Sequence, residues 1–204
     1  YVVAANRGMC HAPGSDVILL NSDTILPARF VESLQACAYA DARTGVVSPL
    51  SNNATICSVP RFLEDNPLPP VDALDAVAAR VAETSAQAYP ELPTAHGFCM
   101  YIRAEVIARI GLFNAERYGC GYGEENDFCE RAKAAGFNVR LCDDLYVAHR
   151  GQASFGAEAG ARREQAIERL TADHPAYAGR IADFIQNNPL RPIQERVDFH
   201  LQRA

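Results

Sequence analysis

The stretch that decides the fold is Asp16-Val17-Ile18-Leu19-Leu20-Asn21-Ser22-Asp23-Thr24, in which an apolar run stops at small polar residues and a carboxylate. The continuous apolar run predicts a strand covered on both faces, as in α/β proteins. Open α/β sheets bind their ligands beyond the carboxyl ends of the strands, which is where Asp23 is expected. Because a carboxylate is not buried without a partner, Asp23 should face a cation or a hydrogen-bond donor.

Two later motifs carry the same kinds of chemistry. The sequence Gly123-Glu124-Glu125-Asn126-Asp127 lies about a hundred residues further on, and His149 follows another apolar run, Leu145 to Ala148. Carboxylate and imidazole groups at the ends of strands and in loops suggest one metal-dependent site.

The rest of the chain alternates between strand and helix patterns, which predicts an α/β fold with a helical C-terminal extension. We expect a core over residues 1–155 and the extension over 156–204. Apolar periodicity and turn residues predict helices over 27–43, 72–89, 104–110 and 125–135, and strands over 17–20, 46–47, 97–102, 139–142 and 145–148. Asn6-Arg7-Gly8 is a turn signal, 51–70 reads as a loop, and the glycines from 111 to 123 predict a mobile loop.

Composition narrows the class of protein. The chain has 204 residues, is 49% hydrophobic and 22% charged, and carries a net charge of -6, which is ordinary for one globular domain. The negative charge, and the lack of a basic run interleaved with aromatic residues, argue against nucleic-acid binding. Seven dispersed cysteines without a C-x-x-C pair indicate reduced thiols in a cytoplasmic protein, and no apolar stretch is long enough to span a bilayer.

Each motif also has a simpler interpretation. Asn21-Ser22-Asp23 on its own is more typical of a capped turn before a helix, and the Glu124–Asp127 cluster is equally typical of an exposed helix start that complements the helix dipole. A single histidine such as His149 is more often a core or rim residue than a ligand. We assign no functional role to the remaining histidines or to the cysteines.

Taken together and in order, the motifs resemble those of the family 2 glycosyltransferases with a GT-A fold, including bacterial polysaccharide synthases and rhamnosyltransferases. The resemblance covers roughly residues 6–155, and the tail around 189–198 is similar to the C-terminal helices of bacterial members. It rests on these segments: Asn6-Arg7-Gly8, 17–24, Ser51-Asn52-Asn53-Ala54, Gly97-Phe98-Cys99-Met100, 123–129 and 149–154. It implies an open mixed sheet flanked by helices.

The resemblance also implies a cation site. Asn21-Ser22-Asp23 matches the D-x-D motif of the family, whose last residue binds the divalent cation, Mn²⁺ or Mg²⁺, on the diphosphate of the nucleotide sugar. Asp23 is therefore the expected metal ligand. His149 matches a histidine that helps hold the cation or the diphosphate. Asn21 replaces the first aspartate of the motif, and its amide can bond a ribose hydroxyl or water.

On the acceptor side, Glu124-Glu125 matches the E-D pair whose second member is the catalytic base, so this role falls on Glu125. Because a glutamate stands in place of the usual aspartate, the base could instead be Glu124. Asp127 matches an acidic residue that follows in the family and orders the start of the helix beside the donor and acceptor. Gly97 and Phe98 match the strand end near the donor sugar and the acceptor.

The resemblance implies an inverting, metal-dependent transferase that moves a hexosyl or deoxyhexosyl group from a nucleotide-sugar donor to a glycan, lipid-linked or protein acceptor. Family members begin with a nucleotide-binding βαβ segment that is absent before Tyr1, so a donor pocket is expected to be incomplete. Two alternatives stay open: a truncated, non-catalytic module that acts in binding or assembly, and a metal-dependent nucleotidyltransferase. The C-terminal helices allow packing on the core, dimerisation or peripheral association with the cytoplasmic face of a membrane, and nothing in the sequence specifies an oligomeric state.

Overall fold

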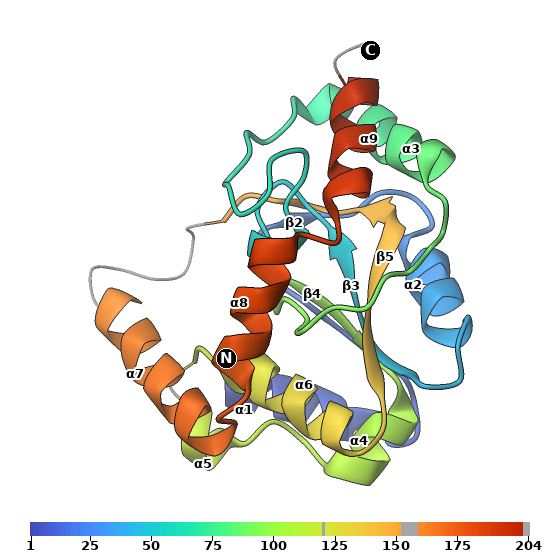
Figure 1. The fold of residues 1–204 in the computed structure, drawn as a ribbon. Helices are drawn as coiled ribbons and strands as arrows, with labels where there is room; N and C mark the ends of the chain where they lie inside the picture. Colours follow the sequence, from blue (N-terminus) through green and yellow to red (C-terminus); the bar gives the residue numbers. More distant parts are fainter. Residues whose placement is uncertain (120, 152–158, 202–204) are drawn as a thin grey trace.

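The computed structural model describes residues 1–119, 121–151 and 159–201 as an α/β fold (Figure 1). Its main sheet contains four strands in the order β1-β4-β3-β5. Their bounds are Val17–Leu20 for β1, Thr44–Leu50 for β3, Cys99–Ile102 for β4 and Asn138–Tyr146 for β5. Strand β4 runs antiparallel to both β1 and β3, whereas β3 and β5 are parallel. The predicted mixed sheet flanked by helices is thereby confirmed.

A second, two-stranded sheet lies beyond the carboxyl end of β1. It pairs β2 (Thr24–Ile25) with β6 (Ala148–His149) in antiparallel register, and Thr24 faces His149. Every residue of β3 is buried, in agreement with a strand covered on both faces. The two sheets together bring the end of the first apolar run next to the end of the last one.

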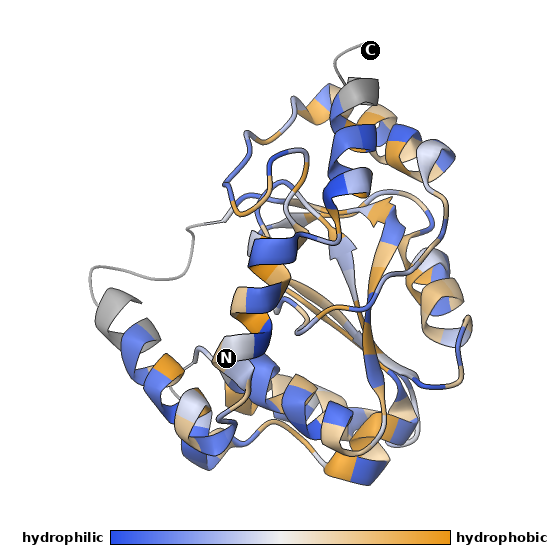
Figure 2. Cartoon of the chain, viewed as in Figure 1, coloured by the Kyte–Doolittle hydropathy of each residue, from blue (hydrophilic) through white to orange (hydrophobic). Residues whose placement is uncertain are grey.

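Helices cover both faces of the main sheet, and Figure 2 shows hydrophobic residues concentrated on the strands and on the helix faces turned toward them. Helix α2 packs on β3 and β5, and α1, α4 and α6 gather on the side away from α2 (Figure 1). The bounds of the helices are Val2–His11 for α1, Phe30–Tyr39 for α2, Leu74–Thr84 for α3, Ala104–Ile110 for α4, Ala115–Tyr118 for α5, Glu124–Ala134 for α6, Ala159–Asp173 for α7, Tyr177–Asn187 for α8 and Arg191–Leu201 for α9. Short 3-10 turns occupy Thr55–Cys57 and Val71–Ala73.

The turn predicted at Asn6-Arg7-Gly8 is wrong, because these residues lie inside α1. The buried residues Val2, Ala5 and Met9 recur at helical spacing and hold the helix on the core. The Asn6 side chain pairs with the backbone of Phe113, donating to its carbonyl at 2.9 Å and accepting from its N–H at 3.0 Å. Asn6, which reads locally as a turn residue, thus makes a tertiary contact.

The two short strands predicted over 139–142 and 145–148 are mostly one strand, β5, with an irregularity in its pairing to β3. The polar residues that suggested a break, Asp143 and Asp144, are buried because the segment 85–89 binds them. Asp143 accepts hydrogen bonds from the Ser85 hydroxyl and the Tyr89 N–H, at 2.8 and 2.9 Å. The same contacts explain why α3 ends at Thr84, five residues earlier than predicted.

The residues around the predicted mobile loop contain the short helix α5, whose start is capped by the Asn114 side chain. Cys120, within that loop, lies outside the described residues, as do the end of the predicted core and the start of the extension between 152 and 158. The described part of the extension is helical, and Leu190, Ile193 and Val197 are buried in the core. Among the described residues, no helix is long and apolar enough to cross a membrane. The described cysteines are all unpaired.

Candidate active site

Asp23 and His149, two residues predicted to form a metal site, lie side by side. The pairing of β2 with β6 and a hydrogen bond from the Arg150 N–H to the Asp23 carbonyl, 3.0 Å long, fix their backbones. The His149 Nε2 atom lies 3.4 Å from the Asp23 Oδ1 atom. Their side chains are only 9% and 14% exposed, so the two groups are close and largely shielded from solvent.

The hydrogen bonds of His149 fix which ring nitrogen is available. Its Nδ1 atom lies 2.7 Å from the backbone carbonyl of Asn53, which only accepts hydrogen bonds. Nδ1 therefore carries the proton, and in the neutral ring Nε2 presents its lone pair beside Asp23. A histidine that donates from one nitrogen to a backbone carbonyl and leaves the other free is typical of a metal ligand.

Asn52 holds the same strand end through its side chain. Its amide donates to the His149 carbonyl at 2.9 Å and accepts from the His149 N–H at 2.8 Å, and the residue is buried. Gly151 has a φ of +67°, a left-handed conformation that favours glycine, and a Cβ atom there would lie 2.3 Å from the Asn53 side-chain nitrogen, so a larger residue would strain this loop. The sequence placed residues 51–54 in a loop but did not identify their role, which is to orient His149.

Phe98 and Asn21 join this site from the ends of β4 and β1. The Phe98 ring stacks on the His149 ring, with centroids 5.0 Å apart and an interplanar angle of 22°. The Asn21 N–H donates to the Phe98 carbonyl at 2.9 Å. His96, to which the sequence assigned no role, packs edge-on against Phe98 with centroids 5.4 Å apart.

The acidic pair Glu124-Glu125 occupies the first turn of α6, next to the end of β4. A Cβ atom at Gly97 would lie 3.7 Å from the Glu125 carboxyl carbon, so the glycine forms one wall against that side chain. The preceding Gly123 has a φ of +87°, and a Cβ there would lie 3.2 Å from the Tyr118 ring. The Glu125 side chain therefore lies next to the residue that directly precedes Phe98 in the chain.

Both carboxyl groups keep their proton to a higher pH than an ordinary glutamate does. Burial, and then repulsion from Glu125, raise the pKa of Glu124 to about 8, and burial raises the pKa of Glu125. The Oε2 atom of each is buried without a hydrogen-bond partner in the structure. Buried polar atoms are normally satisfied, so these oxygens are suited to meet a polar ligand.

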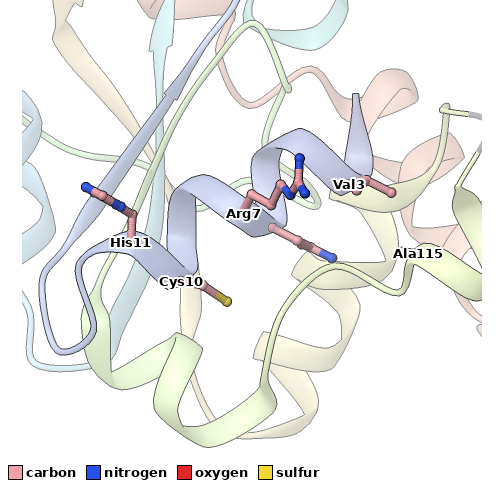
Figure 3. A pocket seen from close by; sticks show the side chains of 6 residues that line it. Val3, Arg7, Cys10, His11 and Ala115 are labelled. Atoms are coloured by element: carbon pink, nitrogen blue, oxygen red, sulfur yellow. The ribbon is translucent and has the colours of Figure 1, made fainter.

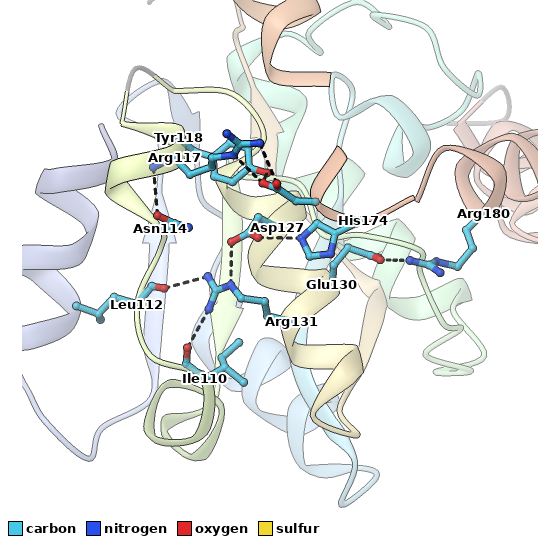
Figure 4. A network of polar contacts seen from close by, with 11 residues as sticks. Ile110, Leu112, Asn114, Arg117, Tyr118, Asp127, Glu130, Arg131, His174 and Arg180 are labelled. Atoms are coloured by element: carbon cyan, nitrogen blue, oxygen red, sulfur yellow. Dashed lines mark hydrogen bonds and ion pairs between the residues drawn. The ribbon is translucent and has the colours of Figure 1, made fainter. Parts of the chain in front are cut away.

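Asp127, predicted to contact donor or acceptor, has its side chain bound within the protein (Figure 4). One carboxylate oxygen accepts from Arg131 at 2.8 Å, and the other lies 2.9 Å from the His174 Nε2 atom. Arg131 in turn donates to the carbonyls of Ile110 and Leu112. Asp127 therefore braces α6 in this structure, and contact with substrate stays a prediction.

The described residues contain no group of three or more histidine, cysteine, aspartate or glutamate side chains arranged to hold a metal ion. Asp23 and His149 would supply two ligands, and the remaining positions would be open to oxygen atoms of a ligand. Mg²⁺ and similar hard cations are commonly held in this way, by one or two protein groups together with substrate phosphates. The residues present thus fit a cation that arrives with a phosphorylated substrate.

A cavity of about 420 Å³ lies elsewhere, along α1 (Figure 3). None of the predicted site residues lines it. Val3, Arg7 and Cys10 follow one side of the helix, His11 lies at its end and Ala115 comes from α5. Because its lining offers no carboxylate, this cavity is not a candidate for the metal-dependent chemistry.

No protein-family model matches the sequence, and no curated protein matches it either. The structure is similar to that of the mannosyltransferase PcManGT from Pyrobaculum calidifontis, solved with GDP-mannose and Mn²⁺, with a TM-score of 0.51 and 22% sequence identity. The alignment covers 96% of this chain and 48% of the mannosyltransferase, so the chain spans about half the length of that protein. At this identity the similarity concerns the fold, which is one that a glycosyltransferase also adopts.

Proposed function

We propose that this chain is the core of an inverting, metal-dependent glycosyltransferase of family 2 with a GT-A fold. It would move a hexosyl or deoxyhexosyl group from a nucleotide sugar to an acceptor hydroxyl in polysaccharide or glycan synthesis. The observation that carries the proposal is the placement of two different groups around the end of β4. The His149 ring, which lies beside Asp23, stacks against Phe98, and the Glu125 side chain lies against the adjacent Gly97.

Asp23 and His149 would hold the divalent cation, Mn²⁺ or Mg²⁺. The cation supplies charge neutralisation on the departing nucleoside diphosphate. Asn52 and Asn53 keep the His149 ring in the orientation that leaves Nε2 free. The presence of GDP-mannose and Mn²⁺ in the structurally similar mannosyltransferase supports a divalent cation in the proposed reaction.

Glu125 would act as the general base. Its carboxylate takes the proton of the acceptor hydroxyl while that oxygen attacks the anomeric carbon from the face opposite the diphosphate. Burial favours the protonated form, so activity should fall as the pH drops through the raised pKa values of the pair. Glu124, with a pKa of about 8, is the alternative base.

The proposal specifies only the reacting group of the acceptor, which is a hydroxyl. A glycan, a lipid-linked sugar and a protein all offer this group. The proposed location is the cytoplasm or the cytoplasmic face of a membrane, where nucleotide sugars would reach the site. The core would span residues 1–155, and the helices of 156–204 would complete it.

The test measures release of nucleoside diphosphate by the 204-residue chain from GDP-, UDP- and dTDP-sugars, with and without Mn²⁺. We expect Mn²⁺-dependent release and a loss of about 10²- to 10⁴-fold in Glu125→Gln, the usual contribution of a general base. Glu32→Gln, on the exposed side of α2, is the matched control. Donor binding without turnover would favour the non-catalytic module, and formation of a nucleoside triphosphate and a sugar 1-phosphate when pyrophosphate is added would favour the nucleotidyltransferase; either result would overturn the proposal.

A further inference from the structure

The junction between α7 and α8 is joined to α6 by a row of polar contacts (Figure 4). The His174 Nε2 atom lies 2.9 Å from the Asp127 Oδ1 atom, and Arg180 forms an ion pair with Glu130. The neighbouring Asp173 accepts hydrogen bonds from Arg117 and Tyr118 of α5, each 2.9 Å long. The C-terminal helices are thus fixed to the helix that begins with the acidic pair.

Tyr177, in the first turn of α8, contacts the residue that follows the acidic pair. The Asn126 side-chain amide donates to the Tyr177 hydroxyl oxygen at 2.7 Å and to the Thr94 hydroxyl at 3.0 Å. Asn126 directly follows Glu125 in α6. Burial, and then the charge of Glu125, raise the pKa of the Tyr177 phenol.

We propose that Tyr177 is a positioning residue for Glu125. Its hydroxyl accepts the hydrogen bond from Asn126 and would thereby hold the first turn of α6, which carries the acidic pair, in place. Independently of Tyr177, Gly97 lies against the Glu125 side chain. The inference rests on the proposed function for its catalytic consequence, but its structural part can be measured independently.

Other titratable groups also face the acidic pair, and they stay in place when Tyr177 is changed. Burial, and then the charges of both glutamates, raise the pKa of the Tyr1 phenol, at the start of α1. Burial, and then the charge of Glu125, also raise the pKa of the Cys129 thiol in α6. These residues belong to α1 and α6. Changing Tyr177 therefore alters only the contribution of the C-terminal helices.

The experiment compares Tyr177→Ala and Tyr177→Phe with the parent chain. Carbon-13 NMR of labelled glutamate carboxyls, assigned with Glu124→Gln and Glu125→Gln, follows the titration of the pair. We expect Tyr177→Ala to move both titrations downward, toward the ordinary range, because the first turn of α6 loses the hydrogen bond that holds it and the carboxyls become more accessible to water. Tyr177→Phe removes only the hydroxyl that accepts from Asn126, so it should move the titrations in the same direction. For turnover, Tyr177→Ala should lower kcat by about 10- to 100-fold with an unchanged donor KM, since misplaced catalytic groups cost rate.

Tyr39→Phe is the control, because it removes a phenol hydroxyl that donates to Asp16, at the opposite end of β1. If Tyr177→Ala does not fold, Tyr177→Leu replaces it. Unchanged glutamate titrations in a folded Tyr177→Ala or Tyr177→Leu would overturn the positioning role, even with full transferase activity in the parent. A downward shift in a chain without transferase activity would support that role and reject the proposed function.

Discussion

At the scale of single residues, Glu124 is a buried carboxyl whose protonation makes the stability of the fold depend on pH. Its pKa is about 8 in the folded chain, against an ordinary value of 4.5. Below pH 4.5 both the folded and the unfolded chain hold this proton, and Glu124 does not lower the free energy of unfolding. Between pH 4.5 and 8 the unfolded state ionises while the folded state stays protonated, so the free energy of unfolding should fall as the pH rises. Each unit of difference is worth about 1.4 kcal/mol.

Glu124→Gln should remove this dependence, leaving the part that belongs to Glu125. Urea denaturation at several pH values between 4.5 and 8 measures it, with Glu32→Gln as an exposed control on α2. Parallel curves for the parent and Glu124→Gln would show that the carboxyl is not protonated in the folded state.

Residues differ in how far the sequence alone could place them. Asp23 and His149 each follow an apolar run, so their position at strand ends could be predicted, and β2–β6 pairing brings them together. Asn52 and Tyr177 act through partners about 97 and 51 positions away in the chain, and no local pattern announces such contacts. Asn126 lies inside the predicted motif, yet only the tertiary structure shows that it binds Tyr177.

At the scale of elements, the predictions succeeded where local periodicity and tertiary packing agree. Helix α4 matches its predicted bounds, and α6 differs by one residue at each end. They failed where buried partners outweighed local turn signals, as at Asn6 in α1 and at Asp143 in β5. Side chains that bind backbone groups far away in the sequence read locally as turn residues, which is why these two breaks were predicted wrongly.

Strand β3 depends on a glycine for its packing against α4 and the start of β5. A Cβ atom at Gly45 would lie 2.7 Å from the Val106 Cγ2 atom and 2.8 Å from the Phe137 Cβ atom. Gly45→Ala should therefore destabilise the fold by about 1–3 kcal/mol, the usual cost of overpacking. Thermal and urea unfolding measure the change.

Gly8→Ala is the matched control, because nothing lies within 4 Å of the added methyl group and the residue is inside α1. Alanine is the better helix former, so this variant should be more stable by about 0.5–1 kcal/mol. An equal response of the two variants would contradict the close packing at Gly45.

At the scale of the whole molecule, the C-terminal helices and the α/β core share one hydrophobic core. Leu190 is fully buried, together with Ile193 and Val197 of α9. Arg196 donates to the carbonyl of Thr84 at the end of α3, 2.9 Å away. The C-terminal helices are therefore attached to the core at two places, through α9 and through the polar contacts between α6 and the α7–α8 junction. This arrangement favours a single cooperative unit.

Leu190→Ala tests this cooperativity. Loss of a buried leucine should cost about 2–5 kcal/mol, and Ile185→Ala, at a residue of α8 that is 37% exposed, should cost much less. The chain has no tryptophan, so tyrosine fluorescence and far-ultraviolet circular dichroism are the suitable probes. In a cooperative unit the two probes give one coincident transition that Leu190→Ala shifts as a whole. If the tail were independent, the variant would lose helical signal early while the core kept its own midpoint. One coincident transition would therefore mean that the hydrogen bond between Tyr177 and Asn126, beside Glu125, forms only when the core and the C-terminal helices fold together.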